Sequence, residues 1–353
     1  MVTRKDIADR LGVSVSVVSR ALHNSGYVRK ETREDILRLA GELGYGQAPA
    51  ALRQTKLDSK RIAIYTANTR NPFYVEVDLG IQAALEHTGY SAVLCRPPFS
   101  DERSKLTSNG IIFMSDGLAY DYLTTDGRQD FRPAVSASFG GSRQLPRHVV
   151  MVECDLWDGT ETLIRYLRGF GHKRIAMVSP LPMDDNDSRI RSWAASMQPV
   201  FGSELNRYYL EVSDATRAGF SQGNLVGGEK MSTVLTAEDF FENGVLAAEL
   251  FAQSSSDATA VICFNEEMGI GFCKKLRRLG IRIPEEVSVV AYDGTYLRRY
   301  VDQTLTVLSL QPYLMGLTCA RTLIRMLEGE KGRNCKITLK EILEGETVAA
   351  PCR

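Results

Sequence analysis

Hydrophobic and polar positions in the first forty-five residues follow the period of three short helices. Thr3 and Asp6 form a capping box that predicts a helix start, and Gly12 predicts its end, because glycine adopts the left-handed conformation at low cost. Ser14 stands where the N-cap of a second helix, residues 15–22, would lie. A third helix is predicted over residues 31–43. Two short helices joined by a tight turn and supported by a third form the layout of a helix-turn-helix.

The outward side of the second predicted helix carries side chains suited to DNA. The guanidinium of Arg20 can donate to a guanine edge or a phosphate, Ser16 can bond to base edges, and Val15 can touch a thymine methyl. In a helix-turn-helix this second helix lies in the major groove. The same spacing also fits a three-helix module that binds something other than DNA, so the pattern alone leaves both interpretations open.

From residue 61 onward, β-branched runs alternate with helical stretches, which predicts an α/β fold with parallel sheets. The length of this region favours two such sheets, in two lobes, and ligands of these folds bind at the carboxyl ends of the strands. Strands are predicted at residues 61–66, 91–95, 110–114, 134–138, 149–152, 174–179, 258–264 and 287–292. Helices are predicted between them, including residues 75–88, 158–170, 268–279 and 312–328.

Composition narrows the class of protein. The chain has 353 residues, is 44% hydrophobic and 24% charged, and balances 43 basic against 43 acidic side chains, which is typical of a globular protein. Residues 1–60 hold 11 Lys+Arg and 7 Asp+Glu, a net +4, so the remainder carries −4. The basic amino-terminal segment, called the head below, is suited to bind a polyanion.

No apolar run approaches the ~20 residues of a membrane span, and the polar N-terminus does not resemble a secretory signal, so we expect a cytoplasmic protein with no membrane partner.

The cysteines and histidines predict neither disulfides nor a metal centre. Seven cysteines are scattered without a C-x-x-C pair, and no two of the four histidines stand at ligand spacing. We therefore expect buried free thiols and no cofactor.

The order of residues in the head resembles the LacI/GalR family of bacterial transcription regulators. The matching runs are Val2-Thr3-x-x-Asp6-Ile7-Ala8, then Gly12 through Leu22 (GVSVSVVSRAL), Thr32-Arg33 and Leu43-Gly44-Tyr45. The resemblance implies a homodimer that binds a double-stranded DNA operator. The residues it would place at the DNA are Thr3, Ser14, Val15, Ser16, Ser19, Arg20, His23 and, from the following hinge, Leu52.

The hinge departs from the family pattern. Residues 45–56 (YGQAPAALRQTK) lack the usual Pro-Asn, and Leu52 lies about two residues earlier than the family's minor-groove leucine. A two-residue shift turns a side chain by roughly 200° around a helix, so the hinge would start later or bend DNA differently. A flexible linker in which Leu52 only packs remains the alternative.

The rest of the chain resembles the family's periplasmic-binding-protein-like core. The matching segments are residues 71–74 (NPFY), 110–112 (GII), 167–175 (LRGFGHKRI), 263–271 (CFNEEMGIG, with Glu266 where Asp is usual) and 280–293 (GIRIPEEVSVVAYD). Residues 96–109 are too few for the usual loop and helix, so that helix would be shortened or lost. We therefore expect a DNA-binding head at 1–46, a hinge at 47–60 and a core at 61–353. The amino lobe would take about 61–171 plus 312–333, and the carboxyl lobe about 172–311 plus 334–353.

The resemblance also implies a small-molecule effector, expected to be a sugar, between the two lobes. Carboxylates, amides and guanidinium groups can each make paired hydrogen bonds to sugar hydroxyls, and aromatic rings can stack on the sugar faces. The expected effector-binding residues are Asn71, Phe73, Asp158, Arg189, Trp193, Asn265 and Asp293. Arg191 is a rival to Arg189, and Asp158 has the alternative role of capping its helix.

An enzyme is disfavoured. Residues 219–223 (GFSQG) match the nucleophile-elbow pattern, but the preceding segment is too polar for a buried strand and no histidine follows Ser221. No Walker loop, dinucleotide fingerprint or H-E-x-x-H is present. The sequence therefore predicts an effector-controlled regulator, most simply a repressor of carbohydrate-utilisation genes. The alternative is a sugar-binding or sugar-processing protein with a vestigial head.

Overall fold

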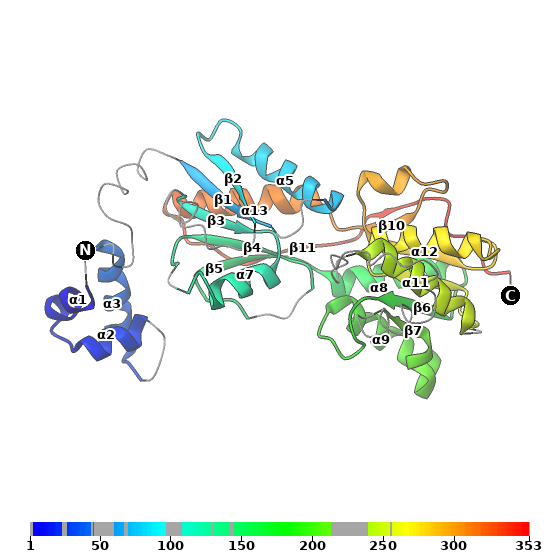
Figure 1. Cartoon of the computed structure of the whole chain (residues 1–353), viewed down its shortest axis with the longest axis horizontal. Helices are drawn as coiled ribbons and strands as arrows, with labels where there is room; N and C mark the ends of the chain where they lie inside the picture. The colour runs from blue at the N-terminus through cyan, green and yellow to red at the C-terminus, as the bar shows by residue number, and fades with distance from the viewer. Residues whose placement is uncertain are drawn as a thin grey trace, which may run out of the picture.

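The computed structural model describes residues 3–22, 27–43, 45, 60–66, 70–96, 108–128, 130–140, 144–212, 239–254 and 256–352. They form a small helical head and two α/β lobes (Figure 1). This architecture confirms the predicted fold class. The predicted hinge at 47–60, including Leu52, and most of the short 96–109 segment lie outside the described residues.

Three helices make up the head: α1 (Arg4–Leu11), α2 (Val15–Leu22) and α3 (Lys30–Glu42). The predicted capping box is present, because Thr3 and Asp6 exchange side-chain and backbone hydrogen bonds at the start of α1. Gly12 ends α1 with φ +65°, in the left-handed region where glycine is not strained. The side chains buried at the centre of the head are Ile7, Ala8, Val18, Ala21, Ile36 and Ala40.

The amino lobe is a parallel sheet with helices on both faces. Its strands are β1 (Arg61–Tyr65), β2 (Ser91–Cys95), β3 (Gly110–Phe113), β4 (Ala134–Ser138), β5 (Val149–Cys154) and β11 (Cys335–Ile337), in the order β11-β5-β4-β3-β1-β2. Its helices are α5 (Pro72–Leu85), α7 (Asp116–Thr124) and α13 (Pro312–Leu327). Ile62 and Ile64 face the core beneath α5 and α13, whereas Ala63 and Tyr65 face α7. This alternation is what a strand covered on both faces requires.

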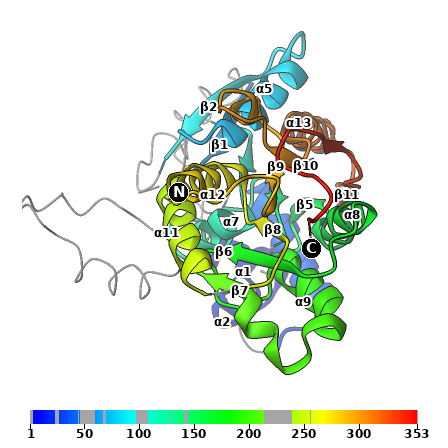
Figure 2. The same ribbon diagram turned by 90° about the vertical axis from the view of Figure 1, so that its right-hand side faces the viewer.

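The carboxyl lobe repeats the plan. Its strands are β6 (Ile175–Ser179), β7 (Tyr209–Glu211), β8 (Ala260–Cys263), β9 (Ser288–Asp293), β10 (Thr306–Ser309) and β12 (Ile342–Leu343), in the order β12-β10-β9-β8-β6-β7. All pair in parallel except β10 with β12. Its helices are α8 (Leu156–Gly169), α9 (Ser188–Phe201), α11 (Phe240–Gln253) and α12 (Glu266–Arg278), with short 3-10 turns η1 (Gly202–Tyr208) and η2 (Tyr296–Arg299). Figure 2 shows the molecule from the side on which this lobe lies.

The chain crosses between the lobes after β5, after β10 and after β11. The expected first boundary near residue 171 is wrong, because α8 already belongs to the carboxyl lobe. It packs against α9, and Thr160 Oγ1 lies 2.8 Å from Tyr292 Oη on β9. The expected placement of residues 334–337 in the carboxyl lobe is also wrong, because β11 pairs with β5 in the amino lobe. The boundaries at the crossovers are therefore close to residues 154, 311 and 338.

Two glycines bring α5 and α13 unusually close together. A Cβ on Gly316 would lie 1.9 Å from the carbonyl oxygen of Val77, and one on Gly80 would lie 2.0 Å from that of Tyr313. Both obstacles are backbone atoms, so an added methyl group could not be accommodated without moving a helix. These glycines fix the separation of the helices that cover the amino lobe.

The seven cysteines all lie among the described residues. All seven cysteines are free, and five of them are buried. No described helix combines the length and the apolar character that crossing a membrane would require.

Candidate functional site

The outward side of α2 is open to solvent. Val15 is 45% exposed, and Ser14, Ser16 and Arg20 are also exposed. Arg20 Nε donates to the carbonyl oxygen of Ser16 at 3.3 Å. Among the described residues this is the only hydrogen bond of the Arg20 guanidinium, and Ser16 and Arg20, four residues apart, lie on the same face of α2.

The other predicted head residues are partly engaged within the head. Thr3 caps α1 through Asp6, and Ser19 accepts from Arg4 Nη1 at 3.4 Å. Arg4 Nε donates to Tyr45 Oη at 2.7 Å, which ties the start of α1 to the end of α3. Arg4 therefore fixes the helix packing that presents α2, a role that sequence spacing did not reveal. His23 lies outside the described residues.

The two lobes touch directly at the predicted effector region. At the start of α9, the backbone N–H of Ser188 donates to the carbonyl oxygen of Gly140, which follows β4 in the amino lobe, at 3.1 Å. On a second side, the N–H of Tyr296 donates to Glu76 Oε1 on α5 at 3.3 Å. Residues at the carboxyl ends of both sheets are therefore brought together where the two lobes touch. This contact region is called the seam below.

Arg189 is the central cation of this region. It is 7% exposed and forms a double hydrogen bond with Asp187, from Nε to Oδ1 at 3.0 Å and from Nη2 to Oδ2 at 2.8 Å. Nη1 donates to the carbonyl oxygen of Phe264 at 3.2 Å, and the guanidinium lies 3.5 Å from the centre of the Phe264 ring. A buried, paired and stacked arginine is held rigidly. Asp187 was not predicted, although its position two residues before Arg189 is the available signal.

Asn265 follows β8, and Asp293 ends the neighbouring strand β9. Asn265 is the N-cap of α12 and accepts from the N–H of Met268 at 2.9 Å. Asp293 Oδ2 accepts from the N–H of Glu266 at 3.3 Å, and Asp293 has the strained φ of +105°. The structure thus brings Arg189, Asn265 and Asp293 into one buried cluster; their role toward an effector stays a prediction.

Glu266 ties the two strand ends together. Its Oε2 accepts from the N–H of Thr295 at 3.0 Å and from its hydroxyl at 2.6 Å, whereas Oε1 is buried with no hydrogen-bond partner in the described residues. Sequence comparison marked Glu266 only as a departure from the family pattern. Its longer side chain is what reaches Thr295, so it holds the loop that carries Asp293.

Burial raises the pKa values of both carboxyl groups here, and repulsion by Asp293 raises that of Glu266 further. Burial and the charge of Asp293 raise the pKa of Glu266 to about 8. Burial raises the pKa of Asp293 to about 6, against the opposing effects of the Glu266 N–H and Arg189. At neutral pH, Glu266 is therefore mainly a neutral acid and Asp293 mainly a carboxylate. Asp293 remains able to accept hydrogen bonds from a hydroxylated ligand.

Asn71 and Phe73 lie on the amino-lobe side of the seam. Asn71 caps α5 by accepting from the N–H of Phe73 at 2.8 Å. The Phe73 ring packs edge-to-face against Phe139 with 4.9 Å between centroids and is 5% exposed. Both are positioned at the carboxyl ends of β1 and β4, where the fold places ligands.

Two predictions about this site need correction. Trp193 is fully buried, and its Nε1 donates to the carbonyl oxygen of Ile175 at 2.9 Å, so it packs in the carboxyl-lobe core and cannot stack on a sugar. Asp158 is not the cap of its helix; Asp155 is, and its Oδ1 accepts from the N–H of Asp158 at 3.4 Å. Asp158 is half-buried, and no hydrogen bond among the described residues joins its carboxylate to Arg189 or Asp293.

Among the described residues, no cluster of three or more His, Cys, Asp or Glu side chains could hold a metal ion.

Comparison with known families gives two matches along the chain. Residues 3–47 match the family described as bacterial regulatory proteins, lacI family, and residues 164–348 match the periplasmic binding protein-like domain. Similar curated proteins include the HTH-type transcriptional repressor CytR of Escherichia coli (strain K12), 24% identical, with 99% of this chain and 97% of that protein covered. The HTH-type transcriptional repressor PurR of Vibrio cholerae serotype O1 (strain M66-2) is 26% identical, with coverage of 99% and 98%.

Similar solved structures support the fold. A complex of the transcriptional regulator CelR with cellobiose has a TM-score of 0.65 and 22% identity, and covers 99% of this chain and 100% of that one. A LacI family transcriptional regulator from Enterococcus faecium with bound ribose also has a TM-score of 0.65, at 18% identity, and covers 82% of this chain and 99% of that one. Both have the same two-lobed architecture.

Proposed function

Because the chain belongs to the LacI family of bacterial regulatory proteins, we propose that it is a DNA-binding transcriptional repressor whose operator affinity is set by a sugar bound between its lobes. The observation that carries the DNA-binding part is the open face of α2. Val15, Ser16 and Arg20 are exposed on this face. The opposite face of α2 packs into the buried core of the three-helix head, and Thr3 caps α1 of that head.

Site-selective binding would come from direct contacts of α2 with base edges. Arg20 can donate two parallel hydrogen bonds to guanine, and Ser16 and Val15 can distinguish neighbouring bases. The excess of basic residues in the first sixty would add affinity for phosphates, without selectivity and with a strong dependence on salt.

The effector would bind against Asp293, Asn265 and Arg189. The carboxylate of Asp293 and the guanidinium of Arg189 offer an acceptor and a donor to adjacent hydroxyl groups, and Phe73 offers an apolar wall from the other lobe. This donor and acceptor set favours a sugar. Ribose and cellobiose in the similar structures support a sugar ligand and the control of carbohydrate-utilisation genes.

The functional unit would be a homodimer formed through the face that carries α5, β2 and η2. Figures 1 and 2 both show these three elements on the upper side of the molecule. β2 is the edge strand of its sheet, and a second copy would cover the exposed apolar surface here. Its members are Val75 (41% exposed), Leu79 (54%), Leu94 (45%), Tyr296 (50%) and Tyr300 (77%). Two heads would then contact two half-sites of a palindromic operator.

Effector binding would control the heads by changing the angle between the lobes. The Ser188–Gly140 and Tyr296–Glu76 hydrogen bonds join the two lobes, so a change of the lobe angle would break or strain them. A ligand that prefers one lobe arrangement by about 1–3 kcal/mol would change operator affinity by roughly 5- to 150-fold.

Fluorescence anisotropy on DNA from upstream of the protein's own gene tests the proposal. The expected result is binding that resists competitor DNA of random sequence, weakens steeply with salt, and changes when ribose, cellobiose or another sugar of a panel is added. Sugar binding without any effect on DNA affinity, or turnover of the sugar, would favour the alternative of a sugar-binding or sugar-processing protein with a vestigial head.

A further inference from the structure

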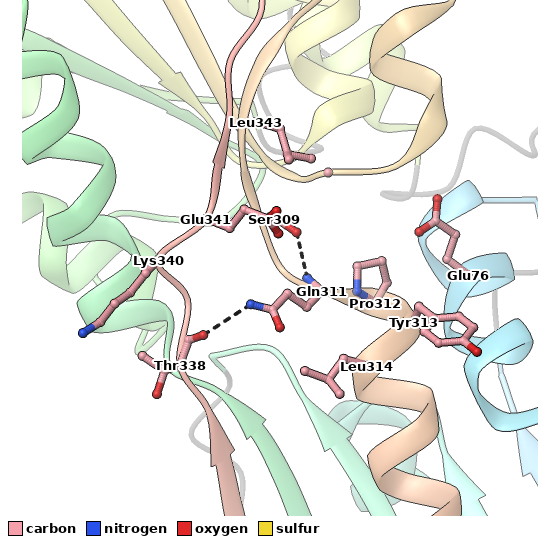
Figure 3. Close-up of a pocket in the computed structure, with 11 residues that line it drawn as sticks. Glu76, Ser309, Gln311, Pro312, Tyr313, Leu314, Thr338, Lys340, Glu341 and Leu343 are labelled. Carbon is pink, nitrogen blue, oxygen red and sulfur yellow. Dashed lines mark hydrogen bonds between the residues drawn. The ribbon is translucent and has the colours of Figure 1, made fainter. Parts of the chain in front are cut away.

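A pocket of about 720 Å³ opens between the lobes beside the crossovers (Figure 3). The amino lobe contributes Glu76 of α5 and the start of α13, and the carboxyl lobe contributes Gly294, Ser309 and Leu343. The volume lies within the roughly 300–1,000 Å³ of small-molecule sites. None of the predicted effector-binding residues lines it, so it is separate from the Arg189–Asp293 cluster.

The charge that faces this pocket is negative. Glu76 is partly buried, and burial raises the pKa of its carboxyl, which means that its charge is incompletely solvated. Oε1 accepts from the Tyr296 N–H, whereas Oε2 forms no hydrogen bond with the part of the chain that the structure describes. Figure 3 shows the carboxylate of Glu76 on the side of the open space, whereas the Lys340 side chain extends away from it. A cationic group would therefore be favoured here, and a phosphate would not.

The start of α13 also lines this pocket, with Gln311, Tyr313 and Leu314. Gln311 precedes this helix in a left-handed conformation (φ +51°) and does not cap it with its side chain. Its backbone N–H donates to Ser309 Oγ at 3.3 Å, and its Nε2 donates to the carbonyl oxygen of Thr338 at 3.5 Å. The N–H groups of Tyr313 and Leu314, in the first turn, have no intrahelical acceptor. They can donate to a ligand hydroxyl, and the helix dipole strengthens such bonds.

We propose that this pocket is a second ligand site, separate from the effector cleft, and that it binds a small hydroxylated amine such as an amino sugar. The ammonium group lies against Glu76, a hydroxyl oxygen accepts from the Tyr313 and Leu314 N–H groups, and the Leu314 and Leu343 side chains contact the carbon skeleton.

The site also bears on the lobe arrangement. Its lining comes from both lobes, so a bound amine stabilises the arrangement in which the Tyr296 N–H reaches Glu76. Its effect on operator binding rests on the proposed function, whereas the binding of the amine does not.

The proposal is tested on the full chain by isothermal titration calorimetry with glucosamine. Glucose, which has a hydroxyl in place of the amine and no charge, is the control ligand. Glucosamine is expected to bind more tightly than glucose, with an affinity that falls as salt is raised. Glu76→Gln keeps an acceptor for Tyr296 but removes the charge, and should weaken glucosamine binding tenfold or more. Glu86→Gln, on the exposed end of the same helix, should leave it unchanged.

Hydrogen exchange locates the ligand independently of any variant. Protection by glucosamine is expected at residues 76–80, 294–296 and 311–315. Absence of glucosamine binding at millimolar concentration, equal binding by Glu76→Gln, or protection confined to residues outside these segments would each overturn the second site. None of these outcomes bears on whether the head binds DNA.

Discussion

Glu266 provides a quantitative test of the buried carboxyl cluster. Its folded-state pKa of about 8 lies well above its ordinary value of 4.5, so the folded state binds the proton more tightly than the unfolded state does. The stability that this proton provides is fully present below pH 4.5 and is lost as the pH rises through 8. A difference of about 3.5 pKa units corresponds to at most about 5 kcal/mol at 1.36 kcal/mol per unit, of which repulsion by Asp293 is a part.

Glu266→Gln should abolish this loss, because glutamine is neutral at every pH and its carbonyl oxygen can still accept from Thr295. Urea unfolding followed by circular dichroism at pH 4.5, 7 and 9 measures the effect. Between pH 4.5 and 9, the free energy of unfolding of the variant should rise relative to wild type by several kcal/mol. Glu285→Gln, on the exposed surface of the same lobe, should show a constant difference. A Glu266→Gln difference that also stays constant would show that Glu266 is ionised in the folded state and would refute the reasoning.

Three further predictions concern the head, the cleft and the amino-lobe helices. Arg20→Ala should weaken binding to the preferred operator by about 1–3 kcal/mol and relax selectivity at one position of each half-site, measured by anisotropy on single-base operator variants; an unchanged preference at every position would exclude base contact by Arg20. Asp293→Asn should weaken sugar binding at least tenfold in calorimetry while leaving operator affinity without sugar unchanged, and equal sugar affinity would remove Asp293 from the site. Gly316→Ala should destabilise the protein by about 1–3 kcal/mol or more, because its Cβ would lie 1.9 Å from a backbone oxygen. Gly169→Ala, which meets nothing within 4 Å, should be neutral or slightly stabilising in the same urea titration, and equal effects of the two would contradict the packing argument.

Local sequence pattern predicted the elements whose signal is strong. The strands at residues 91–95 and 134–138 and the helix at residues 15–22 coincide with β2, β4 and α2, and Ser14 caps α2 as predicted. The helices α7, α9 and α11 were predicted only in general, as helices between the strands, without bounds of their own. α7 is only nine residues long, and α9 contains Pro199 in its last turn, so their helical pattern is weak and tertiary packing determines them.

The division between lobes could not be predicted from local pattern. The residues of α8 have the same apolar periodicity whichever sheet they cover, and β11 has only three residues. What assigns them is pairing between positions far apart in the chain, such as Thr160 with Tyr292 and β11 with β5.

The site shows the same limit. Strand-end positions and family resemblance selected Asn265, Asp293 and Arg189, and the structure brings them together. Trp193 was misplaced, because its spacing from Arg189 on α9 does not reveal that its ring faces the sheet. The double hydrogen bond from Asp187 and the contact of Glu266 with Thr295 depend on side-chain reach across loops, which sequence spacing does not determine.

Selection of binding sites from a random DNA library by the full-length protein tests the central claim most directly. We expect the wild-type protein to enrich one motif with two half-sites in inverted orientation. With the Arg20→Ala variant, we expect the base preference at one position of each half-site to disappear. If the wild-type protein enriches no motif, the open face of α2 does not recognise DNA sequence, and the proposed function is wrong.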